Sequence, residues 1–496
     1  MKKRLPLLLI AILSLMACQQ AQVPANYQQV KKEAPIYPDY AGVTIPVNIA
    51  PLNFELLAPA DEAVTRFTVK DHELVCGGLK VRPDLDEWKE LTASAIGDSI
   101  SVEVFAEKDG QWVRFNPYFI HVSPDSIDSY LSYRMISPSY VSYEELTINQ
   151  RCLENFDEQV MVDNMLCSTE AGGQCINCHN YQQWNPERMQ FHARHAHGGT
   201  VIIYDGQAEK VDMMNETMLS PGVYPAWHPQ LKLIAYSTNK TLQTFHTVDR
   251  NKIEVIDAES DLVLYDIDSH QVTTIEQQPN ELETFPCWSP DGRWLYFSSA
   301  HFEYASDSVD LAEITLRAQD VKYNLYRKPF NPDTRQFGPR ELVLAADSMG
   351  LSATLPRLSP DGRWLLFSMG QWGTFHIWHR DADLWLMNLS TSDFHPVEEL
   401  NSPLAEGYHS WSSNGRWIVF SSRRNDGVFT RPFIGHVDSE GHASKPFELP
   451  TKDPDRHRQL MKSYNVPELM RGPMTLTPQQ VASKMKDEAM PVKFVK

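Results

Sequence analysis

Net positive charge, long apolar runs and cysteine are all scarce in this chain of 496 residues. Lys and Arg number 45 against 64 Asp and Glu, a formal net charge of −19, which argues against nucleic acid or anionic lipid as a partner. Beyond the N-terminus, no apolar run is long enough to span a bilayer. Hydrophobic residues make up 42% and aromatic residues 10%, so we expect a globular chain.

The N-terminus has the pattern of an export signal. Residues 2–4 are basic, and residues 5–16 form an apolar stretch too short to be a spanning helix. The end of this stretch, Leu-Met-Ala-Cys, resembles a bacterial lipobox, which implies that Cys18 carries lipid. The alternative is an ordinary cleaved signal with an unmodified cysteine. We expect a signal peptide at 1–17, a tether at 18–45, and lipid anchoring on the periplasmic side of a bacterial membrane, with the outer membrane favoured.

One short motif carries most of the chemical information in the chain. Cys175, Cys178 and His179 form C-x-x-C-H, the attachment pattern of a c-type haem. Two thiols at this spacing can add to the two vinyl groups of one haem, and the adjacent imidazole can then ligate the iron. No second C-x-x-C-H occurs, so the sequence predicts one haem c and excludes a chain of several haems.

Other interpretations of the motif are a redox dithiol, half of a zinc site, or chance. A redox dithiol normally lies in a thioredoxin-like βαβ unit, for which the surrounding sequence gives no indication. Zinc would need further ligands, which Cys152, Cys167 and either His192 or His195 could supply. Export favours haem, because covalent haem attachment takes place outside the cytoplasm.

The other cysteines have two possible states. In an oxidising compartment Cys152 and Cys167 could pair, since both precede the haem motif closely. We favour buried free thiols for both of them and for Cys76 and Cys287.

A sixth iron ligand would have to be Met or His. His192 and Met189 are the first candidates, followed by His195 and His197, although any one of these histidines is more often solvated or bonded to backbone. An open sixth position would suit a peroxidase, with Arg194 or His195 as the distal acid. We disfavour an enzyme, because the sequence offers no other catalytic constellation.

A second group of polar residues runs from His376 to Asp383 and includes His379, Arg380 and Asp381. We expect it to be a solvated loop rather than a metal site.

A hairpin phrase recurs four times in the second half of the chain. Its copies are centred on Trp227, Trp288, Leu358 and Trp411, and two of them contain the full Ser-Pro-Asp-Gly turn. In this turn Pro restricts φ, Asp suits the third position, and Gly leaves the turn without steric cost. Strand-forming residues follow each turn, and the Trp before it is expected to pack between neighbouring sheets.

These phrases resemble the repeats of TolB-type β-propellers over about 224–450. The whole sequence, from Tyr37 onward, is similar to a group of Bacteroidota lipoproteins that join a TolB-like propeller to one C-x-x-C-H. The resemblance implies an all-β fold with five or six blades, closed by pairing of early and late strands.

The remaining segments complete the predicted domain order. Residues 46–125 contain strand-like runs and predict a small β-sandwich. Residues 126–223 are predicted to form a first blade, interrupted by a short, partly helical haem-binding insertion at about 165–200. After the repeats at 224–450, a tail at 451–496 should contain a short helix with Thr477 as its N-cap.

Two functions follow from these observations. The first is a membrane-anchored periplasmic cytochrome with one haem, used for electron transfer or haem-based sensing, with a protein redox or scaffold partner. The second is a propeller that binds protein, peptidoglycan or glycan and has no redox role. Loss of Cys175 should disrupt the first function and leave the second intact.

Overall fold

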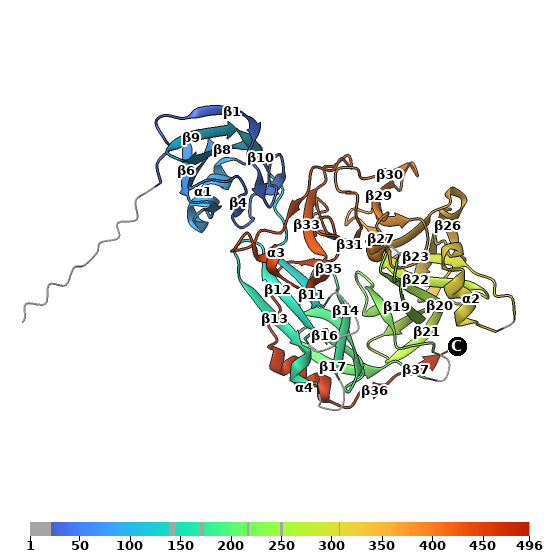
Figure 1. The fold of residues 1–496 in the computed structure, drawn as a ribbon. Helices are drawn as coiled ribbons and strands as arrows, with labels where there is room; N and C mark the ends of the chain where they lie inside the picture. The colour runs from blue at the N-terminus through green and yellow to red at the C-terminus, as the bar shows by residue number, and fades with distance from the viewer. Residues whose placement is uncertain are drawn as a thin grey trace, which may run out of the picture.

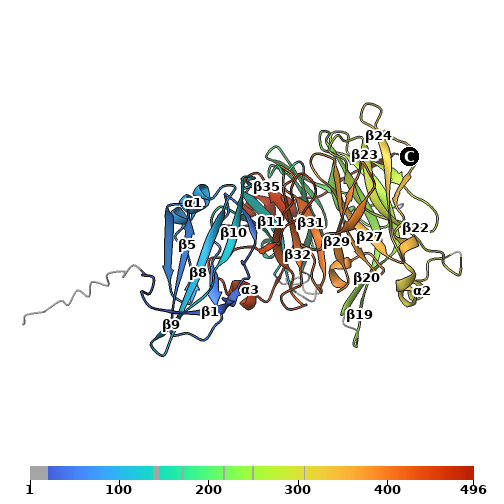
Figure 2. The ribbon, with the colours of Figure 1, turned by 90° about the horizontal axis from the view of Figure 1, so that it is seen from above.

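The computed structural model describes residues 21–137, 145–168, 173–215, 218–248, 251–306 and 308–495. The lipobox and Cys18 lie outside these ranges. The chain is all-β, with a smaller N-terminal domain beside a ring of sheets (Figure 1). The second view shows the N-terminal domain at one side of the ring (Figure 2).

The N-terminal domain contains two sheets and one helix. The larger sheet contains β1 (Gln28–Glu33), β3 (Thr44–Pro46), β5 (Glu62–Val69), β6 (His72–Gly77), β8 (Ser99–Lys108), β9 (Gln111–Asn116) and β10 (Tyr118–Ser123). The smaller sheet contains β2 (Ile36–Tyr37), β4 (Phe54–Leu56) and β7 (Lys80–Val81). Helix α1 (Leu85–Ser94) begins after Asp84, whose side chain accepts two backbone N–H groups, and it buries Trp88 against the sheets.

The sequence predicted a tether at 18–45, but from residue 28 onward the structure has strands that belong to the N-terminal domain. Strand β1 pairs in parallel with β9, and β3 pairs in parallel with β10. Buried residues such as Tyr40 and Val43 explain the difference, because they place this stretch in the domain core.

Within the described residues, the ring consists of six antiparallel units of four strands, numbered here in chain order of their first strands. Unit 1 contains β11 (Tyr130–Ile136), β12 (Thr147–Cys152), β13 (Glu158–Asp163) and β35 (Ser463–Met470). Unit 2 contains β14 (Gln174–Tyr181), β15 (Arg188–His195), β16 (Gly199–Tyr204) and β17 (Gln207–Asp212). Unit 3 contains β18 (Val223–Trp227), β19 (Leu233–Phe245), β20 (Ile253–Asp266) and β21 (Gln271–Glu276).

The other three units follow the same order. Unit 4 contains β22 (Glu281–Trp288), β23 (Trp294–His301), β24 (Asn324–Asn331) and β26 (Glu341–Leu344), with a two-residue β25 (Gln336–Phe337) and helix α2 (Leu311–Leu316) in its connections. Unit 5 contains β27 (Ser352–Leu358), β28 (Trp364–Gly370), β29 (Asp383–Asn388) and β30 (Phe394–Pro396). Unit 6 contains β31 (Glu406–Trp411), β32 (Trp417–Ser422), β33 (Arg431–His436) and β34 (Phe447–Glu448).

The inner strands of the units are β14, β18, β22, β27, β31 and β35. Each contacts the next in this order, and β35 also contacts β14, so the inner strands form a closed circle. This arrangement is that of a β-propeller. The late strand β35 pairs with the early strand β11, which closes the ring as the sequence predicted.

The core is divided into clusters that lie between neighbouring units. One cluster joins Trp227 and Tyr236 of unit 3 to Ile202 of unit 2, and another joins Trp288 and Phe297 of unit 4 to unit 3. Burial of these faces is the main stabilising term, because each four-stranded unit exposes two apolar faces when isolated.

The hairpin phrase forms the link between the first and second strands of its units. In unit 4 the N–H of Gly292 donates to the Ser289 carbonyl, and Gly292 has a φ of 69°, which favours glycine. The predicted packing of Trp between sheets is confirmed: Trp288 Nε1 donates to the Ala226 carbonyl of the preceding unit at 3.1 Å. Strands β20, β24 and β29 are the third strands of units 3, 4 and 5, and each pairs with the fourth strand of its unit.

The haem motif was expected in a partly helical insertion at about 165–200. The structure instead has one short 3-10 turn at Asn164–Leu166, followed by strands β14, β15 and the beginning of β16. The physical reason is the alternation of apolar side chains along β15, where Met189, Phe191 and Ala193 pack in the core between units 1 and 2.

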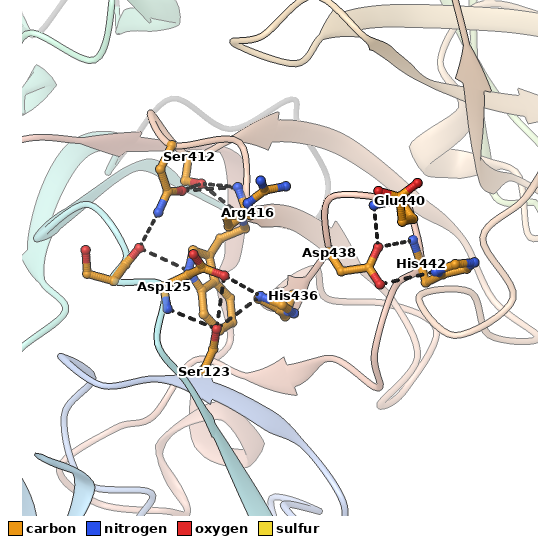
Figure 3. A network of polar contacts seen from close by, with 11 residues as sticks. Ser123, Asp125, Ser412, Arg416, His436, Asp438, Glu440 and His442 are labelled. Atoms are coloured by element: carbon orange, nitrogen blue, oxygen red, sulfur yellow. Dashed lines mark hydrogen bonds and ion pairs between the residues drawn. The ribbon is translucent and has the colours of Figure 1, made fainter. Parts of the chain in front are cut away.

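The N-terminal domain contacts units 1 and 6 through a shared core and through polar groups. His436, at the end of β33, lies 3.1 Å from both Ser123 Oγ and Asp125 Oδ2 at the end of β10 (Figure 3). Trp417 Nε1 donates to the Ser126 carbonyl at 3.1 Å. These contacts hold the domain against one side of the ring, away from its axis.

The C-terminal segment returns along the ring after α3 (Arg456–Gln459) and β35. Helix α4 (Pro478–Lys486) begins with the predicted cap. Thr477 Oγ1 accepts a hydrogen bond from the Gln480 backbone N–H, and Gln480 Oε1 accepts one from the Thr477 backbone N–H. Strands β36 (Met490–Pro491) and β37 (Lys493–Val495) then pair with β17 and β21. No helix within the described ranges has the length and apolarity needed to cross a membrane.

Candidate functional site

All six inner strands contain the same backbone irregularity. In each, the pairing register shifts at a bulge, and one residue of the bulge has a left-handed φ between 47° and 55°. These residues are Cys178, Tyr224, Phe285, Leu355, Tyr408 and Val466. The haem motif therefore occupies the bulge of unit 2, in register with the hairpin phrase of the other units.

The bulge decides where the motif side chains point. In a regular strand, residues three apart lie on opposite faces, so Cys175 and Cys178 would face apart. The register shift between Asn177 and Asn180 changes this, and Cys175, Cys178 and His179 all line one cavity. Two thiols and an imidazole thus share one space near the axis of the ring.

The cavity has a volume of about 230 Å³ and lies where the inner strands meet. Four residues, Asn180, Pro225, Arg357 and Glu468, also line a second cavity of about 450 Å³. The Trp side chains of the hairpin phrases lie around the second cavity. The two cavities therefore follow one another along the channel between the inner strands.

His179 is buried and unpaired. The residue is 2% exposed, and among the described residues neither ring nitrogen has a partner within hydrogen-bond geometry. Burial lowers the pKa of His179 to about 3, and the charge of Arg134 acts in the same direction, whereas the Val466 backbone opposes it without reaching hydrogen-bond geometry. The ring is neutral near pH 7, which is the form that ligates a metal.

His409 offers an internal comparison, because it occupies the same bulge position in unit 6. It is equally buried, at 3% exposed, but its Nε2 donates to the Leu355 carbonyl of unit 5 at 2.8 Å. His409 does not line the cavity, whereas His179 does. One histidine therefore joins neighbouring units, and the other is left without a partner.

The thiols are free in the structure. Cys76, Cys152, Cys167, Cys175, Cys178 and Cys287 are all unpaired. Burial raises the pKa of Cys175, and the charges of Arg134 and Arg194 oppose the shift. Within the described ranges, no three His, Cys, Asp or Glu side chains lie close enough together to hold a metal ion.

The candidate sixth ligands lie elsewhere. His192 is 1% exposed and bonds Thr200 Oγ1 at 3.2 Å, and Met189 packs in the apolar core between units 1 and 2. Neither lines the cavity with His179. His195 is exposed at the β15–β16 hairpin and His197 is half-buried beside it, whereas Arg194 lies at the cavity mouth.

Several cavity residues were not foreseen from the sequence. Arg134, Arg194 and Arg357 line the cavity together with one carboxylate, Glu468. Glu468 accepts from Asn180 Nδ2 at 2.7 Å, and burial raises its pKa to about 7 against the charge of Arg357. For Glu468, the only signal in the sequence is Val-Pro-Glu-Leu at 466–469. This segment forms the sixth copy of the bulge, but it differs too much from the other copies to be recognised from sequence.

An aromatic group forms one wall of the cavity. Tyr224 and Phe285 have ring centroids 4.6 Å apart, and Phe375 lies 5.8 Å and 6.2 Å from them. Trp378 and Tyr408 also line the cavity. Phe375 and Trp378 come from the loop before β29, so the wall combines inner-strand bulges with a connection of unit 5.

The His376–Asp383 segment differs from the solvated loop that its composition predicts. His376 and His379 are fully buried, and His379 Nε2 lies 2.9 Å and 3.0 Å from the two carboxylate oxygens of Glu254. Burial lowers the pKa of His376 to about 3. The pair holds the loop against β20, which positions Phe375 and Trp378.

The donor set at the motif fits a covalently attached haem. Two free thiols and an unpartnered neutral imidazole face one cavity with an aromatic wall. The cavity is smaller than the usual ligand site of roughly 300–1,000 Å³. A macrocycle held by Cys175 and Cys178 would therefore extend toward the mouth at Arg194 or toward the second cavity.

Comparison with known proteins gave no match to a family model and none among curated proteins. Among solved structures, one from a study of two prolyl endopeptidases is 11% identical, with a TM-score of 0.33. It covers 65% of this chain and 42% of its own.

Two further solved structures are similar to this chain. Prolyl oligopeptidase B from Galerina marginata is 10% identical with a TM-score of 0.36, covering 71% of this chain and 42% of its own. An oligogalacturonate lyase in complex with manganese is 12% identical with a TM-score of 0.28, covering 71% and 86%. This chain thus spans less than half the length of the prolyl oligopeptidases it matches.

Proposed function

We propose that the chain is a six-bladed β-propeller lipoprotein that carries one haem c near the propeller axis and acts in electron transfer or haem-based sensing. Each four-stranded unit is one blade. Cys175 and Cys178 would hold the haem through thioether bonds, and His179 would ligate the iron. The resemblance to TolB-like lipoproteins adds lipid attachment at Cys18 and a periplasmic, membrane-bound location.

One observation carries the proposal: the bulge of β14 turns both thiols and a buried, unpartnered imidazole into the same cavity. A buried polar group without a partner costs about 1–3 kcal/mol, so most such groups in proteins are satisfied. The same backbone position in unit 6 shows the satisfied alternative, with His409 bonded to a carbonyl. An iron atom at His179 would supply the missing partner.

The residues around the motif have separate roles in this proposal. His179 binds as a neutral ring, because burial keeps it unprotonated. Arg134 holds the motif strand, since its Nη1 donates to the Ile176 carbonyl at 3.1 Å. Tyr224 and Phe285 give the cavity an aromatic wall. Haem, when bound, supplies one-electron redox chemistry or coordination of a small ligand.

The test is haem content after expression of the mature chain with a c-type maturation system. The reduced pyridine spectrum of the denatured protein should show a c-type band, and Cys175→Ser/Cys178→Ser should remove it. Cys76→Ser is the matched control, because Cys76 lies in β6 of the N-terminal domain, outside the cavity lining. A folded wild-type protein without the band would refute the haem proposal.

The second candidate function is a propeller that binds a ligand or partner without redox chemistry. The two successive cavities along the axis favour it, because they provide a binding site in a protein that carries no haem. In that case the cysteine double variant should keep its fold and its binding. Loss of binding together with haem would contradict this alternative.

A further inference from the structure

The charges inside the first cavity are opposite in sign to those of the chain as a whole. The chain has a net charge of −19, yet the cavity contains three arginines and one glutamate. Glu468 is also the group whose burial favours its neutral form, with a pKa raised to about 7. The cavity is therefore a basic pocket in an acidic protein, and its potential attracts anions.

The arginine at the back of the pocket is buried without an anion. Arg134 is 8% exposed, and its Nη1 and Nη2 donate to neutral acceptors, the Ile176 carbonyl and Asn465 Oδ1 at 3.3 Å. Its Nε has no partner. None of the ion pairs found among the described residues includes Arg134, Arg194 or Arg357. A buried guanidinium without a counter-ion is costly, so this arrangement is typical of a site that an anion completes.

Arg194 contributes a second guanidinium to the same cavity. It lies opposite Cys175 in the β14–β15 pairing, one residue from the carbonyl that Arg134 binds. It is exposed at the mouth of the cavity. Arg194 and the aromatic residues Tyr224, Phe285 and Phe375 line the same cavity.

We propose that the cavity binds a carboxylate on an aromatic or apolar body, with Arg194 and Arg134 holding the carboxylate and the Tyr224–Phe285–Phe375 wall packing on the body. The same chemistry has two possible sources: the carboxylates of the haem itself, or a separate small organic acid. The first source rests on the proposed haem function, and the second does not.

Binding to the full-length Cys175→Ser/Cys178→Ser protein tests this without covalent attachment. The probes are two matched pairs: protoporphyrin IX with its dimethyl ester, and 2-naphthoate with its methyl ester. Each pair keeps the apolar body and removes the negative charge. Binding can be followed by quenching of tryptophan fluorescence, because Trp378 lines the cavity, and by calorimetry.

We expect at least one acid to bind about tenfold or more tightly than its ester, and rising salt to weaken it. Arg194→Gln should weaken acid binding by roughly 10–100-fold, the usual effect of losing a hydrogen bond to a charged group. The matched control is Arg293→Gln, which removes one charge from an exposed arginine in the turn before β23 and should change binding less than twofold.

The two probe pairs distinguish the haem carboxylates from a separate organic acid, and the pyridine spectrum tests the haem proposal independently of carboxylate binding. A charge effect confined to the porphyrin pair assigns the site to the haem carboxylates, and one confined to the naphthoate pair assigns it to a separate acid. Equal binding of acid and ester in both pairs, or an Arg194→Gln change below twofold with the fold intact, overturns the inference. Failure of the haem proposal is detected separately, by the pyridine spectrum of the wild-type protein.

Discussion

One backbone position explains how the C-x-x-C-H motif can belong to a repeated inner strand and also line the cavity. The residue after the left-handed position is Pro in four inner strands, at Pro225, Pro286, Pro356 and Pro467, and His in the other two, at His179 and His409. Proline is tolerated there because a bulge leaves one N–H outside the pairing ladder. Histidine fills the same position but adds a polar ring that must find a partner.

Comparison of two alanine variants tests the difference between these histidines. His409→Ala should destabilise the haem-free protein by about 1–3 kcal/mol more than His179→Ala, because only His409 leaves a carbonyl, that of Leu355, without its donor. Urea unfolding of both variants measures this. In the haem-loaded protein, His179→Ala should change the Soret band and His409→Ala should not. A haem spectrum equally sensitive to both would argue against His179 as the ligand.

At the scale of elements, the alternation of apolar residues and the turn chemistry predicted most strands well. Strand β11 lies in the segment 126–223 that was predicted to form a first blade, and β29 lies in the repeats predicted at 224–450. The bulges could not be predicted, because they arise where inner strands curve around a shared axis rather than from local propensity. For the same reason the motif segment looked like an insertion, although it is an inner strand.

Helix α4 gives a prediction at this scale. Its capping box joins Thr477 and Gln480, and its buried face, with Val481 and Met485, packs on units 1 and 2. Thr477→Ala should lower the free energy of unfolding by about 1 kcal/mol, whereas Thr477→Ser should keep the cap and the stability. Chemical denaturation of the three proteins measures the difference. Equal losses in both variants would show that the hydroxyl does not act as the cap.

At the scale of the molecule, closure of the ring depends on one strand from the C-terminal segment. Strand β35 pairs with β11 and contacts both β31 and β14, so it joins the first and last units. Each unit buries its faces only against neighbours, so an open ring would expose two apolar faces.

Two truncations test this dependence. Removal of 463–496 deletes β35 and should abolish cooperative thermal unfolding and cause aggregation. Removal of 489–496 deletes only the edge strands β36 and β37 and should cost about 1–2 kcal/mol. Circular dichroism and size-exclusion chromatography distinguish the outcomes. A monomeric, cooperatively folded 463–496 deletion would show that the ring does not need its closing strand.

The amino-acid sequence alone determined the all-β class, the hairpin phrase with its packed tryptophans, the cap of α4 and the motif at Cys175, Cys178 and His179. These follow from local rules: side-chain period, turn geometry and the spacing of reactive groups. The tertiary structure decided that the motif lies in an inner strand at the axis, that His192 and Met189 face away from it, and that Arg134, Arg357 and Glu468 join it. Glu468, for example, reaches the motif strand through Asn180, which lies 288 residues away in the chain, and no local pattern encodes such a contact.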